Sequence, residues 1–203
     1  MMRIRKLSFR SICLIVGIVL ILLSMSLLIF WQSRIKRNAE ALSVYVQTLE
    51  ELIPEVQSAV IEPRVNNAMP SLNVHGNNFI AILELPANDA SLPVGASWSV
   101  MDAYPCLYTG SAYDGSLIVG ASNQKGQFDF VKEISVGNAV YVTDMTGNQF
   151  SYKVTDIQYC DHADNQTLSS ESDDLTIFVK NIYAFEYIII RCRSCLKCIN
   201  FCN

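Results

Sequence analysis

The longest uninterrupted apolar stretch of the chain lies near the N-terminus. Residues 12–31 carry no charge and consist mainly of Ile, Leu, Val, Met and Phe, with two Ser and one Gly. About twenty apolar residues are the length that a helix needs to cross a bilayer. A cleaved signal peptide usually has a shorter apolar core and a small-residue exit. We therefore interpret residues 12–31 as an uncleaved transmembrane anchor.

Basic residues stand on both sides of this stretch, with a small excess on the N-terminal side. The positive-inside rule then favours residues 1–11 as a cytoplasmic basic segment. The rest of the chain would lie outside the cell, as a single-pass protein of the plasma membrane. The basic residues are Arg3, Arg5, Lys6 and Arg10 before the stretch and Arg34, Lys36 and Arg37 after it.

The next segment has apolar residues at helical spacing on one face. This pattern predicts a stalk helix over residues 38–60, which Pro54 should kink or divide. The helix either packs on the domain that follows or binds a partner. Residues 61–78 contain two Pro, five Asn and a Gly, which is typical of a linker. The apolar positions are Leu42, Tyr45, Val46, Leu49, Leu52, Ile53 and Val56.

Beyond the linker the pattern changes to short apolar or alternating runs that are separated by turn residues. No long helical pattern interrupts them, so residues 79–193 are predicted to form a closed or nearly closed antiparallel β-domain. Residues 144–147, Asp-Met-Thr-Gly, look like a hairpin turn between two of the runs. The predicted strands are 79–85, 117–119, 139–143, 150–159, 175–179 and 187–191.

Composition narrows the possible partners. Charged residues make up 17% of the chain and the formal net charge is −4, which argues against a nucleic-acid partner because phosphate contacts need clustered Lys and Arg. The apolar stretch makes the membrane the expected partner. Nothing in the pattern calls for a cofactor.

The order of motifs in the β-region is similar to that of the sortases, bacterial surface cysteine transpeptidases. The resemblance covers roughly residues 77–193 and implies an all-β fold, an eight-stranded β-barrel preceded by a transmembrane helix and a stalk helix. The motifs are Leu85-Pro86, Leu92-Pro93-Val94, Leu117-Ile118-Val119-Gly120, Gly126-Gln127-Phe128, Val136-Gly137-Asn138, Leu175-Thr176-Ile177-Phe178 and Ile188-Ile189-Ile190-Arg191-Cys192.

The resemblance also implies three catalytic positions. A sortase needs a Cys thiolate as nucleophile, a His to protonate the leaving amine and an Arg near the developing oxyanion. Alignment by motif places Ala121, Lys180 and Tyr187 at the positions of the His, the Cys and the Arg. Arg191 lies four residues along the last strand and does not replace the Arg. The chain is thus predicted to be a catalytically silent member of the family, a pseudoenzyme that binds a surface peptide or a partner protein.

An alternative is an active cysteine transpeptidase or hydrolase that uses displaced residues. The chain has two His, of which His75 falls in the predicted linker and His162 follows Cys160 in an acidic loop. A Cys160/His162 pair is one candidate site. Cys106 near the groove and Lys180 as a nucleophile of depressed pKa are others.

The C-terminal segment 194–203 is rich in cysteine. Cys192, Cys195, Cys198 and Cys202 have the spacing of a ferredoxin-type iron–sulfur run, although Asn203 stands where such a run usually has Pro. The spacing leaves open a metal site, disulfides or partner crosslinks, and an unstructured thiol-rich tail. A third possible function is therefore that of a thiol- or metal-binding surface protein that acts through this tail.

Overall fold

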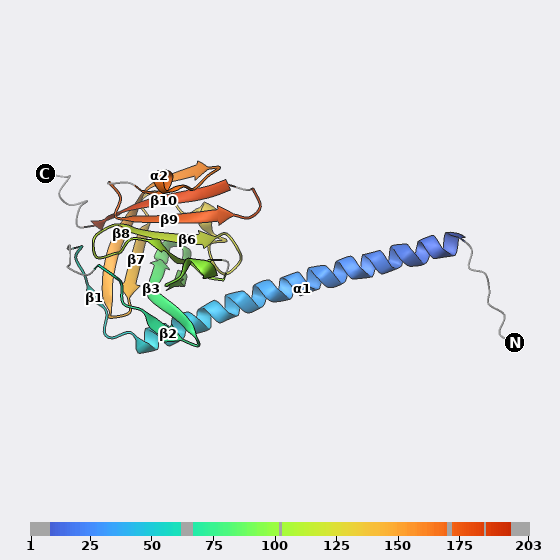
Figure 1. Ribbon diagram of the computed structural model, residues 1–203, viewed down its shortest axis with the longest axis horizontal. Helices are drawn as coiled ribbons and strands as arrows, with labels where there is room; N and C mark the ends of the chain where they lie inside the picture. Colours follow the sequence, from blue (N-terminus) through green and yellow to red (C-terminus); the bar gives the residue numbers. More distant parts are fainter. Residues whose placement is uncertain (1–8, 62–66, 102, 170–171, 185, 196–203) are drawn as a thin grey trace. The chain divides into compact units, whose positions relative to one another are not determined.

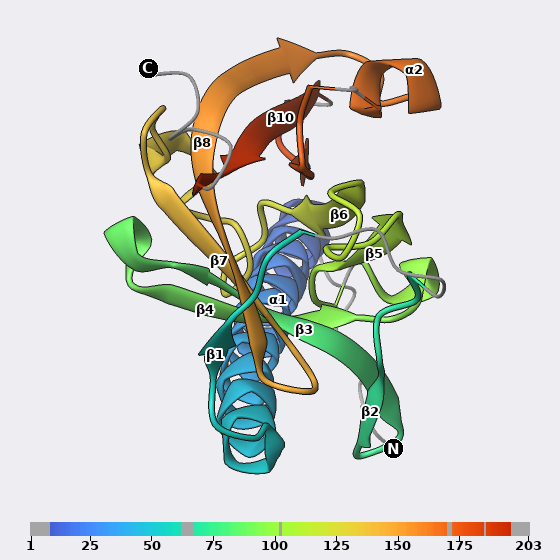
Figure 2. The same ribbon diagram turned by 90° about the vertical axis from the view of Figure 1, so that its left-hand side faces the viewer.

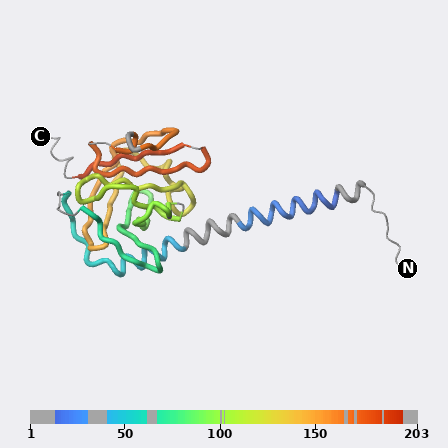
Figure 3. Tube along the Cα trace, in the orientation of Figure 1, coloured from blue at the N-terminus to red at the C-terminus, as the bar shows by residue number. Residues whose placement is uncertain are grey.

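The computed structural model describes residues 9–61, 67–101, 103–169, 172–184 and 186–195. These residues belong to two compact units, which divide after Arg37. The first unit contains the start of helix α1 (Phe9–Leu52), and the second contains its end together with all the described strands. Figure 3 traces the chain by residue number.

In the second unit, one face of α1 packs on the β-domain. Leu42, Val46 and Leu49 recur at helical spacing and are buried. The helix ends at Leu52, short of the predicted end at residue 60, because Pro54 lacks an N–H and its ring disfavours a helical residue before it. The partners of this face are Val74, Phe79, Ile82, Tyr104 and Met145.

The predicted span at residues 12–31 falls within α1. Over the described parts of the chain, however, no helix meets the length and apolar character that crossing a membrane requires.

Ten strands form one sheet within the described residues, and they include all six of the runs predicted from the sequence. Two of the strands lie outside the predicted β-region: one in the predicted stalk helix and one in the predicted linker. The strands are β1 (Gln57–Ser58), β2 (Leu72–Val74), β3 (Asn77–Leu85), β4 (Ala90–Gly95), β5 (Cys106–Thr109), β6 (Leu117–Ser122), β7 (Ala139–Asp144), β8 (Asn148–Cys160), β9 (Leu175–Asn181) and β10 (Glu186–Ser194).

Four short helices complete the described elements. They are η1 (Pro86–Asn88), η2 (Trp98–Val100), η3 (Val131–Glu133) and α2 (Asn165–Leu168). The first three are single 3₁₀ turns that connect strands. No long helix interrupts the described β-region, as the sequence predicted.

Strand pairing closes the sheet into a barrel. The order of neighbours is β8-β10-β9-β6-β5-β4-β3, and β7 pairs with both β3 and β8, so eight strands form a closed ring (Figures 1 and 2). The predicted eight-stranded barrel is confirmed. The prediction that it is antiparallel is wrong in part, because β6 runs parallel to β9 and β4 runs parallel to β5. Local alternation marks strands but does not reveal which distant strands become neighbours.

Alternate residues of each strand fill the barrel interior. On β9, Leu175, Ile177 and Val179 point inward, whereas Phe178 packs on the outer face with Ile189 of β10. Because side chains in a strand alternate between faces, this pattern fixes which residues of β6, β9 and β10 face outward. The outward residues at the ends of these strands make up the candidate site.

Candidate functional site

Strand register brings four residues into one row across four strands. Ser122 of β6 pairs with Lys180 of β9, Lys180 pairs with Tyr187 of β10, and Tyr187 pairs with Cys160 of β8. Directly paired residues share a face of the sheet, so the four belong to the outward face that also carries Phe178. We call Ser122, Lys180, Tyr187 and Cys160 the outer row.

Lys180 and Tyr187 lie together, but Ala121 does not join them. Ala121 pairs with Val179, and both are buried in the barrel interior. A shift of one residue along a strand moves a side chain to the other face, so Ser122, and not Ala121, shares the outward face with Lys180. The alternation of Leu117 and Val119, both inward, already contains the signal that Ala121 points inward as well.

Ser122 is fully buried and held by a glutamine. Its hydroxyl and its backbone N–H lie 3.4 and 3.3 Å from Oε1 of Gln127. Next to it, Nδ2 of Asn123 donates to Oδ1 of Asn181 over 2.8 Å, which ties the end of β6 to the end of β9. None of these amide and hydroxyl groups releases a proton near neutral pH. The cluster is therefore suited to holding strands together and not to acid–base chemistry.

The next two members of the outer row, Lys180 and Tyr187, differ in their surroundings. The Lys180 side chain is exposed, whereas Tyr187 is half-buried with its ring 6.4 Å from that of Phe178. A nucleophilic lysine is typically buried, and the exposed Lys180 is not. Arg191 lies farther along β10 and is engaged elsewhere, because it donates to Asp173 over 3.1 Å and to the Thr167 carbonyl over 2.6 Å.

An aromatic cluster covers the outer face beside the row. The ring of Trp98 on η2 lies 5.0 Å from Tyr108 and 5.5 Å from Phe178, and Tyr108 and Phe178 are 5.4 Å apart. The indole also lies directly over β6, since a Cβ on Gly120 would come within 2.3 Å of it. Trp98 is nevertheless 41% exposed. The cluster thus presents an aromatic surface to solvent.

Cys106 lies under this cluster and is fully buried. Its Sγ is 3.8 Å from the carbonyl of Gly120 and 3.9 Å from that of Trp98. A nucleophile must reach its substrate. The position of Cys106 behind Trp98 does not allow that in this conformation.

Cys160 is the one thiol of the outer row. Burial raises the pKa of the Cys160 thiol, and Asp161 and Asp164 add to this, although a hydrogen bond from the His162 backbone and the charge of Arg191 oppose it. A raised pKa keeps most of the thiol protonated, which makes Cys160 a weaker nucleophile at neutral pH. His162 is exposed, and His75 sits with a φ of 52° in the turn between β2 and β3, beside Tyr45. Neither imidazole belongs to the outer row.

The predicted cysteine tail falls only partly within the described residues. Cys192 lies in the barrel interior, and burial strongly raises the pKa of its thiol, with Asp173 contributing. Cys195 is partly exposed, while Cys198 and Cys202 lie outside the described residues. No cluster of three or more potential ligands is present in the described part of the chain. A four-cysteine site stays a prediction, and it would require Cys192 to leave the core.

Comparison with known proteins identifies the domain. Residues 81–180 match the family model described as the sortase domain. No curated protein matches the chain. Among solved structures, the lid mutant of Streptococcus agalactiae sortase C1 is similar, with a TM-score of 0.50 and 15% identity over 61% of this chain and 70% of that one.

Two further solved structures are similar at comparable identity. The Clostridium perfringens sortase D5 transpeptidase has a TM-score of 0.49 and 15% identity over 57% of this chain and 78% of its own. A lid mutant of Corynebacterium diphtheriae sortase A has a TM-score of 0.45 and 18% identity over 57% of this chain and 69% of its own. The family match and the closed mixed barrel agree with the resemblance seen in the motifs. Residues 81–180 are therefore a sortase-family domain.

Proposed function

We propose that this chain is a catalytically silent sortase-like domain that binds a surface peptide or a partner protein. The observation that carries the proposal is the outer row, in which the residues around the end of β9 are Ser122, Lys180 and Tyr187. Thiol-based peptide cleavage needs a thiolate, an acid and oxyanion support at one carbonyl. These three residues can donate hydrogen bonds, but they include neither a thiol to form the thiolate nor an imidazole to act as the acid.

The aromatic cluster supports a binding role for the same face. Trp98, Tyr108 and Tyr187 combine apolar rings with polar edges, and Trp98 and Tyr187 both pack against Phe178. Partly exposed Trp and Tyr are the residue types most enriched among binding hot spots. Exposed Lys180 adds a positive charge beside them. The face suits an extended peptide with apolar side chains and an acidic group.

Replacing Trp98 with Ala should weaken peptide binding by at least about tenfold, which corresponds to a typical hot-spot residue. The measurement is fluorescence anisotropy with labelled sorting-signal peptides from surface proteins of the same organism. Val136→Ala is the matched control, because Val136 is another exposed apolar side chain, 62% exposed, on a different turn. Peptide binding with equal affinity in Trp98→Ala, or no binding to the unmodified protein, would count against the proposed binding face.

A second candidate function is cleavage by Cys160. The observation in its favour is that Cys160 belongs to the outer row beside Tyr187. Its raised thiol pKa and the exposed position of His162 argue against it. The cleavage assay described in the Discussion distinguishes the two candidates.

We also propose that α1 anchors the domain to the plasma membrane, with the β-domain outside the cell. Its support is the stretch from Leu14 to Phe30, where large apolar side chains on all sides of the helix are 47–66% exposed and therefore favour apolar surroundings. A thiol reagent that cannot cross membranes should label Cys160 in intact cells, and Cys160→Ser should lose that labelling. Labelling of Cys160 only after lysis would reverse the proposed orientation.

A further inference from the structure

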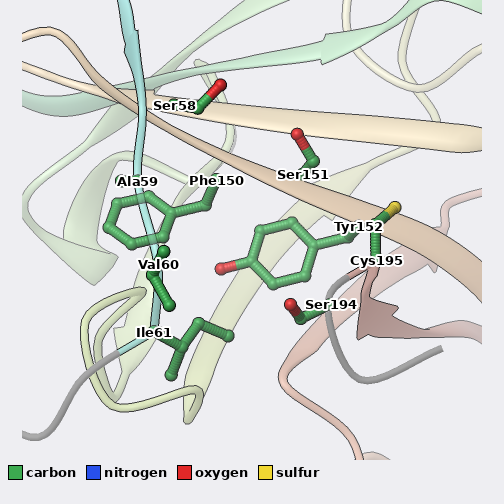
Figure 4. A pocket seen from close by; sticks show the side chains of 9 residues that line it. All are labelled: Ser58, Ala59, Val60, Ile61, Phe150, Ser151, Tyr152, Ser194 and Cys195. Carbon is green, nitrogen blue, oxygen red and sulfur yellow. The ribbon is translucent and has the colours of Figure 1, made fainter. Parts of the chain in front are cut away.

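A second concave site lies at the far end of the β8–β10 ladder from the outer row. A partly open cavity of about 250 Å³ lies between residues 58–61 and the strands β8 and β10 (Figure 4). Tyr152 of β8 pairs there with Ser194 of β10, whereas the outer row has the pair of Cys160 and Tyr187. Eight residues separate Tyr152 from Cys160 along β8, which is roughly 25 Å of strand. The cavity is therefore a separate site.

Tyr152 is the unusual residue of this cavity. Its side chain has no exposed surface, and its hydroxyl has no hydrogen-bond partner among the residues that the structure describes. Figure 4 shows the hydroxyl pointing into the cavity, toward the space between Val60, Ile61 and Ser194. A buried hydroxyl without a partner costs about 1–3 kcal/mol. Such a group is rare in a folded protein and marks a position where a partner is expected.

The walls of the cavity are uncharged. Ala59, Val60, Ile61 and Phe150 supply apolar surface, and the polar groups are hydroxyls and the thiol of Cys195. Burial keeps the pKa of Tyr152 far above its ordinary value, and Asp174, Cys192 and Asp114 raise it further. The phenol therefore stays protonated and can donate a hydrogen bond. The negative charges of Asp174 and Asp114 disfavour an anion as its acceptor.

We propose that this cavity binds a small, uncharged and mainly apolar molecule whose carbonyl or ether oxygen accepts a hydrogen bond from the Tyr152 hydroxyl. The size is adequate, because a dry cavity of about 150 Å³ already accommodates benzene. One ring or a short branched chain with a single polar substituent fits the volume and the one buried donor. The site is independent of the binding face proposed for the sortase-family domain.

Two probes of similar shape test the proposal. Acetophenone carries a carbonyl oxygen and ethylbenzene does not, so their affinities for the full-length chain isolate the contribution of an acceptor. We expect acetophenone to bind about fivefold more tightly than ethylbenzene, as one ordinary hydrogen bond allows. Tyr152→Phe should remove that preference and leave ethylbenzene binding unchanged. Titration calorimetry in one buffer measures the four affinities, which are those of each probe for the unmodified chain and for Tyr152→Phe. Because every titration contains the same detergent, partitioning of a probe into the detergent cancels when its affinities for the two proteins are compared.

A second variant keeps the test decisive if Tyr152→Phe folds poorly. Val60 lines the cavity and is 52% exposed, so Val60→Trp should be tolerated and should fill the space. Both probes should then lose saturable binding. The proposal is overturned if the unmodified chain binds neither probe, if it binds both with equal affinity, or if binding persists in Val60→Trp.

Discussion

Replacing Asp144 with Ala is expected to lower the free energy of unfolding of the unit 38–203 by about 3–4 kcal/mol. Hydrogen bonds to a charged group contribute about 1.5–3 kcal/mol, and a buried donor that loses its acceptor destabilises the folded state further. Asp144 ends β7 and has no exposed surface. Its carboxylate accepts hydrogen bonds from the Tyr113 hydroxyl, from the N–H and hydroxyl of Thr146, and from the N–H and side-chain amide of Asn148. Chemical denaturation followed by circular dichroism measures the loss.

The pH dependence of this loss follows from the carboxylate. Burial alone would raise the pKa of Asp144, but the hydrogen bonds from Tyr113, Asn148 and Thr146 hold it below its ordinary value. A depressed folded-state pKa gives stability that is present above the unfolded-state pKa and is lost as the pH falls through the folded-state pKa. The difference between the unmodified unit and Asp144→Ala should therefore shrink below about pH 4.

An exposed aspartate provides the control. Asp129 is exposed and is not part of the Asp144 turn, so Asp129→Ala should change the stability by less than about 0.5 kcal/mol. If Asp144→Ala were as mild as Asp129→Ala, the turn would not depend on the buried carboxylate.

The second large effect concerns the register of β6. We expect a variant with Ser122→His, Lys180→Cys and Tyr187→Arg to cleave a sorting-signal peptide at a rate about a hundredfold or more above that of the unmodified chain. This factor is the lower end of what a positioned general acid contributes. The corresponding set of substitutions with Ala121→His in place of Ser122→His should show no such increase. Both sets also carry Gln127→Ala, because Ser122 is buried against Gln127 and an imidazole needs that space.

Folding of the two sets should differ as well. Ala121 is fully buried in the barrel interior, so a His there adds volume and an unpaired polar ring to a packed core, which costs about 1–3 kcal/mol or more. A lower melting temperature for the Ala121→His set, together with its inactivity, would support the register. Equal peptide-cleavage activity of the two variants would contradict the assignment of Ala121 to the inner face of the barrel and of Ser122 to the outer face.

Local patterns in the sequence predicted six of the ten described strands, because each of these alternates or is continuously apolar over its own length. The hairpin turn at residues 144–147 was also predictable, because Asp and Gly at its ends are typical turn residues. The partner of its carboxylate was not, since Tyr113 lies thirty-one residues away from Asp144 and meets it only through the fold. The parallel pairing of β6 with β9 is equally non-local.

The candidate site shows the same limit more sharply. Motif alignment pointed to the ends of β6, β9 and β10, and the strand register pairs Lys180 with Tyr187 there. The alignment did not give the face of the residues after Gly120, and the structure turns Ala121 into the barrel interior and pairs Ser122 with Lys180. It could not show that Cys160 joins the same row, because the pairing of β8 with β10 depends on tertiary structure. The buried hydroxyl of Tyr152 likewise has no signature in the sequence.

The measurement that tests the central proposal most directly is cleavage of labelled sorting-signal peptides by the unmodified chain, with mass spectrometry to detect a thioester on any cysteine. The outer row predicts neither product nor thioester above the background of the denatured protein. Turnover that a thiol reagent abolishes, and that is lost in Cys160→Ala but kept in Cys106→Ala, would contradict the silent-domain proposal and establish a displaced nucleophile at Cys160.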